Sequence, residues 1–292
     1  MSLSLSPEAE RDFSDACRRS DIERVALYET NLKQDEQLLR TGLWMAAKNG
    51  LPELTRYFLS QGARWDRSIL ASAARSDKIG RLGVFQALRE YGWDVNESGR
   101  DGETMLSYVV DDVHVVRWFL EQGADPNIGP RLHFRRQRTR PIRPVPDSGR
   151  TLDMIAQCGT LEVLELMLEY GLRLNSGSAL HLAAKTRVWP DADQIPMLAR
   201  LIDLGFDVNG HDPDPLARPP YLCDTPLNCT IQYGHVKRFE YLLQRGATLD
   251  LWRLETLRRV ARTGVLVHSG SPELVEAIDR HVASMSTSDQ SS

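Results

Sequence analysis

The sequence lacks the features that mark several large classes of protein. Its four cysteines include no Cys-x-x-Cys pair and no dense framework, which favours a reducing, intracellular setting. No apolar run approaches the roughly 20 residues that a membrane-spanning helix needs. The first residues contain neither a basic segment nor a long apolar stretch, so they do not resemble a secretory signal. We therefore expect a protein of the cytoplasm or nucleus that does not bind membranes.

Sequence motifs of the common enzyme classes are missing as well. There is no glycine-rich phosphate loop, no His-Glu-x-x-His and no Gly-x-Ser-x-Gly. Acidic residues and histidines are scattered, and the one loop that mixes them, 210–223, matches no known spacing of metal ligands. We therefore expect no enzymatic activity, no bound metal and no cofactor.

What the chain does contain is typical of a folded protein. It has 292 residues, of which 41% are hydrophobic and 26% charged, so one large domain or two ordinary ones can form a core. Its formal net charge of −4 gives no general attraction to nucleic acid or to an anionic membrane. We expect a monomer.

A pattern recurs six times along the chain. Each copy begins with a leucine that precedes a pair of mostly small residues, continues through an apolar stretch and ends at a glycine. The leucine and the glycine are 19 residues apart in three copies and between 17 and 25 apart in the others. The leucines are Leu43, Leu70, Leu106, Leu152, Leu180 and Leu227, and the glycines are Gly62, Gly92, Gly123, Gly171, Gly205 and Gly246.

Each copy predicts two short helices. The small residues allow close packing of the first helix, and apolar residues at helical spacing form the buried face of the second. The final glycine suits the left-handed conformation that ends many helices. One helix pair cannot bury its apolar face alone, so neighbouring pairs must stack and share a continuous core.

These motifs resemble ankyrin repeats. The closest match is Thr225-Pro226-Leu227-Asn228, and the segment 178–184 also fits the family pattern T-P-L-H-x-A. Gly-Ala-Asp-Pro-Asn at 123–127 matches the ending of a family repeat. The resemblance implies an all-α fold, an ankyrin-repeat solenoid of stacked helix-turn-helix units with irregular finger loops between them.

The spacing also suggests where the repeats begin and end. We expect an array of about seven to eight units over residues 11–281, with insertions at 128–150, 187–196 and 210–223. We expect residues 1–10 and the Ser-rich tail 282–292 to be disordered.

In the family, a concave groove is formed by the first helix of each unit and by the fingertips. Carried over to this chain, the two positions after each small pair should face that groove. Asp111 and Asp112 would form an acidic centre in an otherwise mixed surface. The predicted groove residues are Lys48, Asn49, Arg75, Ser76, Asp111, Asp112, Gln157, Lys185, Thr186, Gln232, Tyr233 and Arg262.

The first long loop contains an unusual basic segment, which we call the basic finger. It has six arginines and no acid between residues 131 and 143, and without them the net charge of −4 would be −10. It could dock an acidic partner, contact phosphates, act as a nuclear import signal, or simply be a solvated insertion. Its arginines are Arg131, Arg135, Arg136, Arg138, Arg140 and Arg143.

Other conspicuous side chains are expected to be structural. In the family, the histidine at the position of His181 bonds locally and orders the turn, here with Ser178. Four tryptophans mostly fall where neighbouring repeats pack, so the core is their default place: Trp44, Trp65, Trp93 and Trp118. Of these, Trp65 and Trp93 lie near finger bases and could also be partly exposed anchors.

The sequence therefore favours a non-enzymatic scaffold or adaptor that binds another protein, with an acidic segment as one candidate ligand. Two alternatives stay open. One is a nuclear or nucleic-acid-associated regulator that uses the basic finger, which the overall charge does not favour. The other is an atypical enzyme with a small-molecule site in the groove.

Overall fold

The computed structural model describes residues 5–76, 78–99, 101–130, 143–175, 178–188, 191–212, 224–263 and 271–288. These residues are helical apart from turns and one isolated bridge between Gly129 and Val145, which confirms the expected all-α fold. None of the described helices is long and apolar enough to cross a membrane. The chain divides into two compact units, unit 1 with residues 1–131 and 138–146 and unit 2 with residues 132–137 and 147–292.

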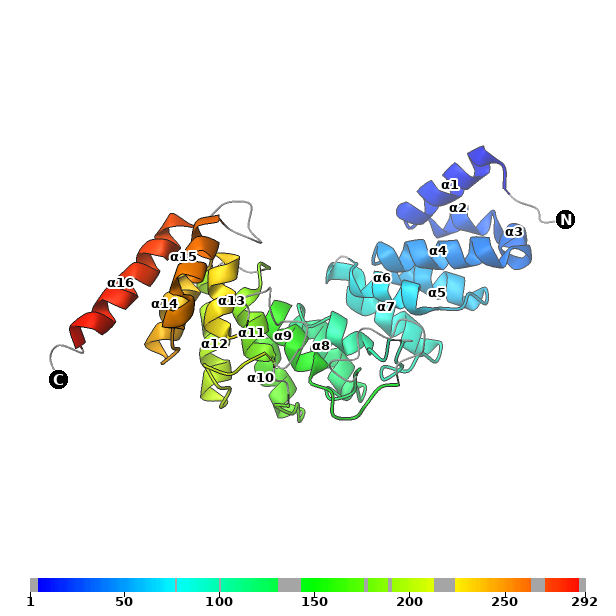
Figure 1. Cartoon of the computed structure of the whole chain (residues 1–292). Coiled ribbons are helices and arrows are strands. Elements are labelled where there is room, and N and C mark those ends of the chain that lie inside the picture. The colour runs from blue at the N-terminus through cyan, green and yellow to red at the C-terminus, as the bar shows by residue number, and fades with distance from the viewer. Residues whose placement is uncertain are drawn as a thin grey trace. The chain divides into compact units, whose positions relative to one another are not determined.

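Unit 1 is a stack of helix pairs (Figure 1). Helices α1, α4 and α6 and the 3-10 helix η1 form an inner row, and each of them packs on the next. The partners α5, α7 and α8 pack on one another in an outer row. The elements are α1 (Pro7–Arg18), α2 (Ile22–Ala26), α3 (Glu29–Gln34), α4 (Glu36–Lys48), α5 (Pro52–Ser60), α6 (Arg67–Ala74), α7 (Lys78–Glu90), η1 (Met105–Tyr108) and α8 (Val113–Glu121).

Unit 2 repeats this arrangement. Its inner row is α9, α11, α13 and α15, and its outer row is α10, α12, α14 and α16, with neighbours in each row in contact (Figure 1). The elements are α9 (Arg150–Cys158), α10 (Leu161–Glu169), α11 (Ala179–Lys185), α12 (Asp191–Asp203), α13 (Pro226–Tyr233), α14 (Val236–Gln244), η3 (Leu251–Arg253), α15 (Leu254–Thr263) and α16 (Pro272–Ser288).

The six recurring leucines and glycines occupy equivalent places in these pairs. All six leucines are buried, from 0% to 3% exposed. All six glycines follow an outer helix with φ between 82° and 95°, a conformation that other residues rarely adopt. The sequence reading of one helix pair ending at each glycine is therefore confirmed. The Thr-Pro start behaves as expected too, since the Thr225 hydroxyl accepts the Asn228 amide and caps α13.

Neighbouring fingers are joined by asparagine side chains at the turn after an outer helix. In unit 1, Asn96 donates to the carbonyl of Gly123 and accepts the Asp125 amide, both at 2.9 Å. In unit 2, Asn209 donates to the carbonyl of Gly246 at 3.0 Å and accepts the Thr248 amide at 2.8 Å. Each amide thus pairs with a donor and an acceptor of the next repeat, which fixes the spacing of the fingers.

The last carbonyls of the inner helices have no partner within their own helix, so other side chains must bind them. The guanidinium Nη1 of Arg238, a fully buried residue of α14, donates to the carbonyl oxygens of Ala183, Ala184 and Thr186 at the end of α11. The amide of Gln194, on α12, similarly donates to the carbonyl of Ala156 in α9 at 2.8 Å. These contacts join each pair to the one before it.

Three predicted boundaries are wrong. Helix α1 begins at Pro7, inside the segment 1–10 expected to be disordered, because Ser6 caps it and a proline suits its first turn. At the other end, α16 continues to Ser288, into the segment 282–292, since extending a packed helix adds a hydrogen bond per residue. The insertion 187–196 is shorter than expected, because α12 starts at Asp191 and uses Gln194 for packing.

We predict that Arg238→Met lowers the free energy of unfolding by about 3 kcal/mol, because it leaves carbonyls at the end of α11 buried without a donor. Lys237→Met, at the exposed neighbouring position of α14, is the matched control and should change it by less than about 0.5 kcal/mol. Urea unfolding of both variants measures the difference. Equal stability of the two variants would contradict the capping role of Arg238.

Candidate binding surface

The inner row of unit 1 exposes an aromatic ring between cationic side chains. On α4, Trp44 and Lys48 are four residues apart and therefore share one face. Trp44 is 37% exposed, so the expectation that it lies in the core is wrong. The Lys48 ammonium lies 4.7 Å from the centre of the Trp44 ring, within cation–π range. Arg75, just after the end of α6, is also exposed. We call Trp44, Lys48 and Arg75 the unit 1 stripe.

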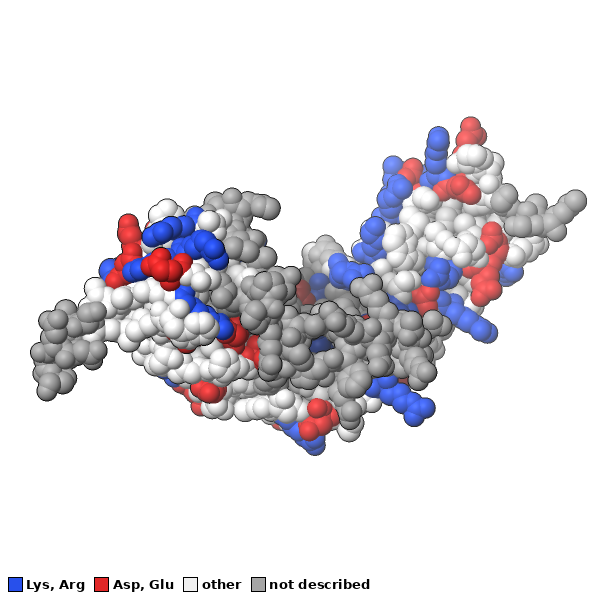
Figure 2. Space-filling view, in the orientation of Figure 1, with Lys and Arg blue, Asp and Glu red and all other residues white. Residues whose placement is uncertain are grey.

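The two cations of this stripe have no acidic partner in the part of the chain that the structure describes. Within the described residues, neither Lys48 nor Arg75 forms an ion pair. Figure 2 shows Lys and Arg side chains gathered along the side of unit 1 formed by α1, α4 and α6. An uncompensated positive surface attracts anions.

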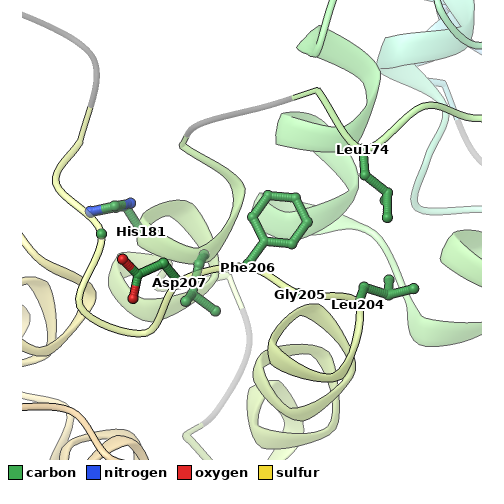
Figure 3. Close-up of a pocket in the computed structure, with 8 residues that line it drawn as sticks. Leu174, His181, Leu204, Gly205, Phe206 and Asp207 are labelled. Carbon is green, nitrogen blue, oxygen red and sulfur yellow. The ribbon is translucent and has the colours of Figure 1, made fainter.

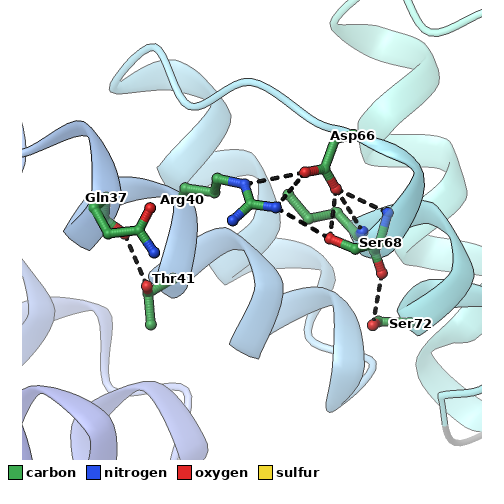
Figure 4. Close-up of polar contacts among 7 residues, drawn as sticks. Gln37, Arg40, Thr41, Asp66, Ser68 and Ser72 are labelled. Atoms are coloured by element: carbon green, nitrogen blue, oxygen red, sulfur yellow. Dashed lines mark hydrogen bonds and ion pairs between the residues drawn. The ribbon is translucent and has the colours of Figure 1, made fainter.

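A third cation of this face is already engaged. Arg40 of α4 donates to the carboxylate of Asp66 and to the hydroxyl of Ser68, 26 and 28 residues further along (Figure 4). The same carboxylate caps α6, since it accepts the amides of Ser68 and Ile69 at 2.8 and 3.1 Å. Partial burial opposes ionisation of Asp66, but the hydrogen bonds from Ser68 and Arg40 outweigh it and lower its pKa to about 2. Arg40 thus ties α4 to α6 and is a structural residue.

Arg67 is engaged in the same way. It pairs with Asp101 at 2.6 Å and donates to the hydroxyl of Tyr108 at 2.9 Å. The Tyr108 hydroxyl donates in turn to the carboxylate of Glu103. Burial, together with this bond to Glu103, raises the pKa of Tyr108 to about 12, so the phenol stays protonated as a donor.

The predicted acidic centre is not a free acidic surface. Asp111 forms an ion pair at 2.7 Å with Arg81, a buried residue of α7 that also donates to the carbonyl of Ser76. Asp112 is the cap of α8 and accepts the amides of His114 and Val115. Both carboxylates therefore make structural contacts while remaining partly exposed, and the acidic centre stays a prediction.

Three further predicted groove residues are buried. Ser76 donates to the carbonyl of Ala73, and Thr186 donates to the carbonyl of Gln157 at 2.7 Å. Gln232, on α13, is only 4% exposed. Consecutive residues of a helix point about 100° apart, so the two positions after a small pair need not both face the groove. The others, Asn49, Gln157, Lys185 and Tyr233, are exposed or half-exposed.

Unit 2 exposes a similar combination on its last inner helix. Trp252, in η3, is 77% exposed and lies under the guanidinium of Arg253 at 4.3 Å from its ring centre. Arg253 is engaged in an ion pair with Asp224. Arg259 and the predicted groove residue Arg262 are three residues apart on α15, are exposed, and form no ion pair with the described residues. We call Trp252, Arg259 and Arg262 the unit 2 stripe, which the sequence pattern found only in part.

His181 is buried, as expected of a structural residue, but its partner differs. Its Nε2 lies 3.3 Å from the carbonyl oxygen of Asp224, while the hydroxyl of Ser178 donates to Asp212 instead. The predicted bond between His181 and Ser178 is therefore wrong, because the carboxylate of Asp212 is the stronger acceptor. Burial lowers the pKa of His181, so its ring is neutral at pH 7.

Most of the basic finger falls outside the described residues. This holds for Arg131, Arg135, Arg136, Arg138 and Arg140. Arg143 is described and is exposed. The roles considered for the finger thus stay predictions.

Among the described residues, no group of three or more His, Cys, Asp or Glu side chains is placed to hold a metal ion. Unit 2 contains a small pocket of about 280 Å³ between its finger turns, lined by leucines, Phe206, His181 and Asp207 (Figure 3).

Comparison with known proteins agrees with this architecture. A family model described as ankyrin repeats (3 copies) matches residues 24–129. Among solved structures, the human ASB11 ankyrin repeat domain is similar over 82% of this chain and 96% of that one, with a TM-score of 0.51 and 19% sequence identity. An identity this low shows a shared fold alone. Among curated proteins, no sequence matches the chain.

The pKa of Asp66 predicts how its contact with Arg40 responds to acid. Because the folded pKa of about 2 lies below the ordinary value of 3.8, the ionised carboxylate stabilises the fold above about pH 4, and this contribution is lost as the pH falls toward 2. Asp66→Asn keeps a capping side chain but loses the charge. We expect it to destabilise unit 1 by about 0.5–1 kcal/mol at pH 6, a value reduced for solvent screening, and by less at pH 3. Urea unfolding at both pH values measures this, and a deficit that does not shrink in acid would contradict it.

Proposed function

Because this chain is an ankyrin-repeat protein, and ankyrin repeats are generally protein–protein interaction modules, we propose that it is a non-enzymatic scaffold or adaptor. It binds a partner protein through the exposed side chains of its inner helices. The partner surface that fits best is an acidic segment that also carries apolar side chains.

The observation that carries this proposal is the pair of stripes. Each combines one exposed tryptophan with two cations that form no ion pair in the described part of the chain, Lys48 and Arg75 in unit 1 and Arg259 and Arg262 in unit 2. Tryptophan and arginine are enriched among the residues that dominate binding energy. Free cations add attraction for carboxylates and speed association with an acidic partner.

The neighbouring ion pairs support this use of the stripes. Arg40 pairs with Asp66 and Arg67 pairs with Asp101. These ion pairs restrain α4 and α6, the helices that carry the stripe. A rigid surface loses little conformational entropy on binding, which leaves more of the contact energy for affinity. The stripes are therefore suited to binding rather than to a chemical step.

The proposed setting is the cytoplasm or nucleus, with the chain acting as a monomer that does not contact membranes. Cys17 is a buried free thiol, which supports a reducing compartment.

We predict that Lys48→Glu combined with Arg75→Glu lowers capture of the partner at least about tenfold, since two attractive charges become repulsive. The wild-type chain and the variant are immobilised and exposed to an extract of cells that express the protein, and bound proteins are quantified by mass spectrometry. Raising the salt concentration should lower the captured amount of the same proteins, because salt screens the exposed charges.

The control is Arg117→Glu combined with Lys237→Glu, which changes the net charge equally on exposed positions of the outer helices α8 and α14. It should leave the captured set unchanged. If both double variants lose the same proteins, or if neither does, the unit 1 stripe is not the binding surface. Circular dichroism spectra that match the wild type exclude misfolding as the cause.

A further inference from the structure

The pocket of unit 2 is lined by residues that belong to neither stripe. It lies where the turn after α10, the start of α11 and the turn after α12 meet (Figure 3). Its volume is about 280 Å³. Pockets for small-molecule ligands usually hold about 300–1,000 Å³, so this one is closer to the size of a single large side chain. It is lined by Leu174, Leu180, His181, Leu204, Gly205, Phe206, Asp207 and Gly210.

One end of the pocket is apolar. Leu174 is 40% exposed, and Leu204 and Phe206 are half-exposed, although side chains of this type are usually buried. In the view of Figure 3 these two leucines lie on one side of the Phe206 ring. In the part of the chain that the structure describes, these three side chains keep part of their surface open, and an apolar group entering here would remove that surface from water.

The other end of the pocket offers hydrogen-bond acceptors. In the view of Figure 3, His181 and Asp207 lie on the far side of the Phe206 ring from the two leucines. The Nε2 of His181 lies 3.3 Å from the carbonyl oxygen of Asp224, and its buried Nδ1 has no hydrogen-bond partner among the described residues.

The carboxylate of Asp207 is exposed and accepts only the amide of Asn209, at 2.9 Å, among the described groups. No cation of the described chain pairs with it. The polar end therefore combines the carboxylate of Asp207, which pairs with no described cation, with a buried ring nitrogen, and the carboxylate is complementary to a cation that donates hydrogen bonds.

We propose that this pocket is a second docking site, which receives from a partner protein a large apolar side chain directly followed by lysine or arginine. The apolar side chain fills the end formed by Leu174, Leu204 and Phe206, and the cation pairs with Asp207. This site goes beyond the proposed function, since it selects a basic ligand where the two stripes select an acidic one.

The test uses the full chain and three synthetic peptides that differ at two central residues, Gly-Ser-Phe-Lys-Ser-Gly, Gly-Ser-Phe-Glu-Ser-Gly and Gly-Ser-Ser-Lys-Ser-Gly. Binding is followed by NMR through the methyl groups of Leu174 and Leu204. The Phe-Lys peptide should change the methyl chemical shifts of both leucines saturably, with a Kd of about 1 mM. Such weak binding is expected because only two side chains of the peptide contact the pocket. The Phe-Glu and Ser-Lys peptides should bind at least about fivefold more weakly.

Two variants separate the two ends of the pocket. Asp207→Asn keeps the acceptor for the Asn209 amide and should lower the affinity for the Phe-Lys peptide at least about fivefold. The control Glu169→Gln, on the exposed face of α10, should leave this affinity unchanged. Leu174→Arg places a cation at the exposed apolar rim and should abolish saturable binding.

The proposal is overturned if the Phe-Lys peptide causes no saturable shift, if the Phe-Glu or Ser-Lys peptide binds equally well, or if Asp207→Asn binds like the wild type. These peptides carry at most one acid, so a failure here leaves the acidic partner of the stripes untouched. Should Leu174→Arg fail to fold, the comparison of Asp207→Asn with Glu169→Gln still decides.

Discussion

The stacking of the helix pairs depends on how the last carbonyls of inner helices such as α6, α9 and α11 find hydrogen-bond donors. These carbonyls lie between helix pairs, where water cannot reach them, and a buried carbonyl without a donor costs free energy. In unit 2 the donors come from the next pair, Arg238 for the end of α11 and Gln194 for the end of α9. In unit 1 the donor is Arg81, which reaches the Ser76 carbonyl. A polar contact therefore sets the register in which the apolar faces stack.

This constraint also decides which charged residues are free to bind a partner. Arginines that brace the stack, such as Arg238 and Arg81, are buried and surrounded by acceptors. Those that tie neighbouring inner elements together, such as Arg40 and Arg67, are neutralised by aspartates. What is left on the inner rows is a small set of cations that form no ion pair with the described residues, together with exposed tryptophan. The proposed binding surface is thus what remains after the structural charges have been paired.

The repeat itself could be predicted from the sequence, because each of its signals is local. A glycine such as Gly123 is favoured where the chain turns with positive φ, and an apolar residue such as Leu106 where a helix faces the core. The site could be predicted only in part. The groove prediction took the two positions after each small pair together. It could not show that Arg75 is exposed and Ser76 buried, because their exposure depends on where α6 ends. Nor does it show that Asp111 meets Arg81, 30 residues away.

The two kinds of site follow from different physical requirements and therefore predict different behaviour. A stripe on helices is shallow and charged, so its affinity comes from several exposed ion pairs and one aromatic contact, and it should weaken as salt rises. The pocket between finger turns is concave and mostly apolar, so the affinity proposed for it comes mainly from burying one apolar side chain of the partner. Asp207 would favour a partner in which lysine or arginine follows that side chain. Salt should therefore discriminate between them, because screening removes most of the attraction at the stripes but leaves the apolar contact at the pocket in place.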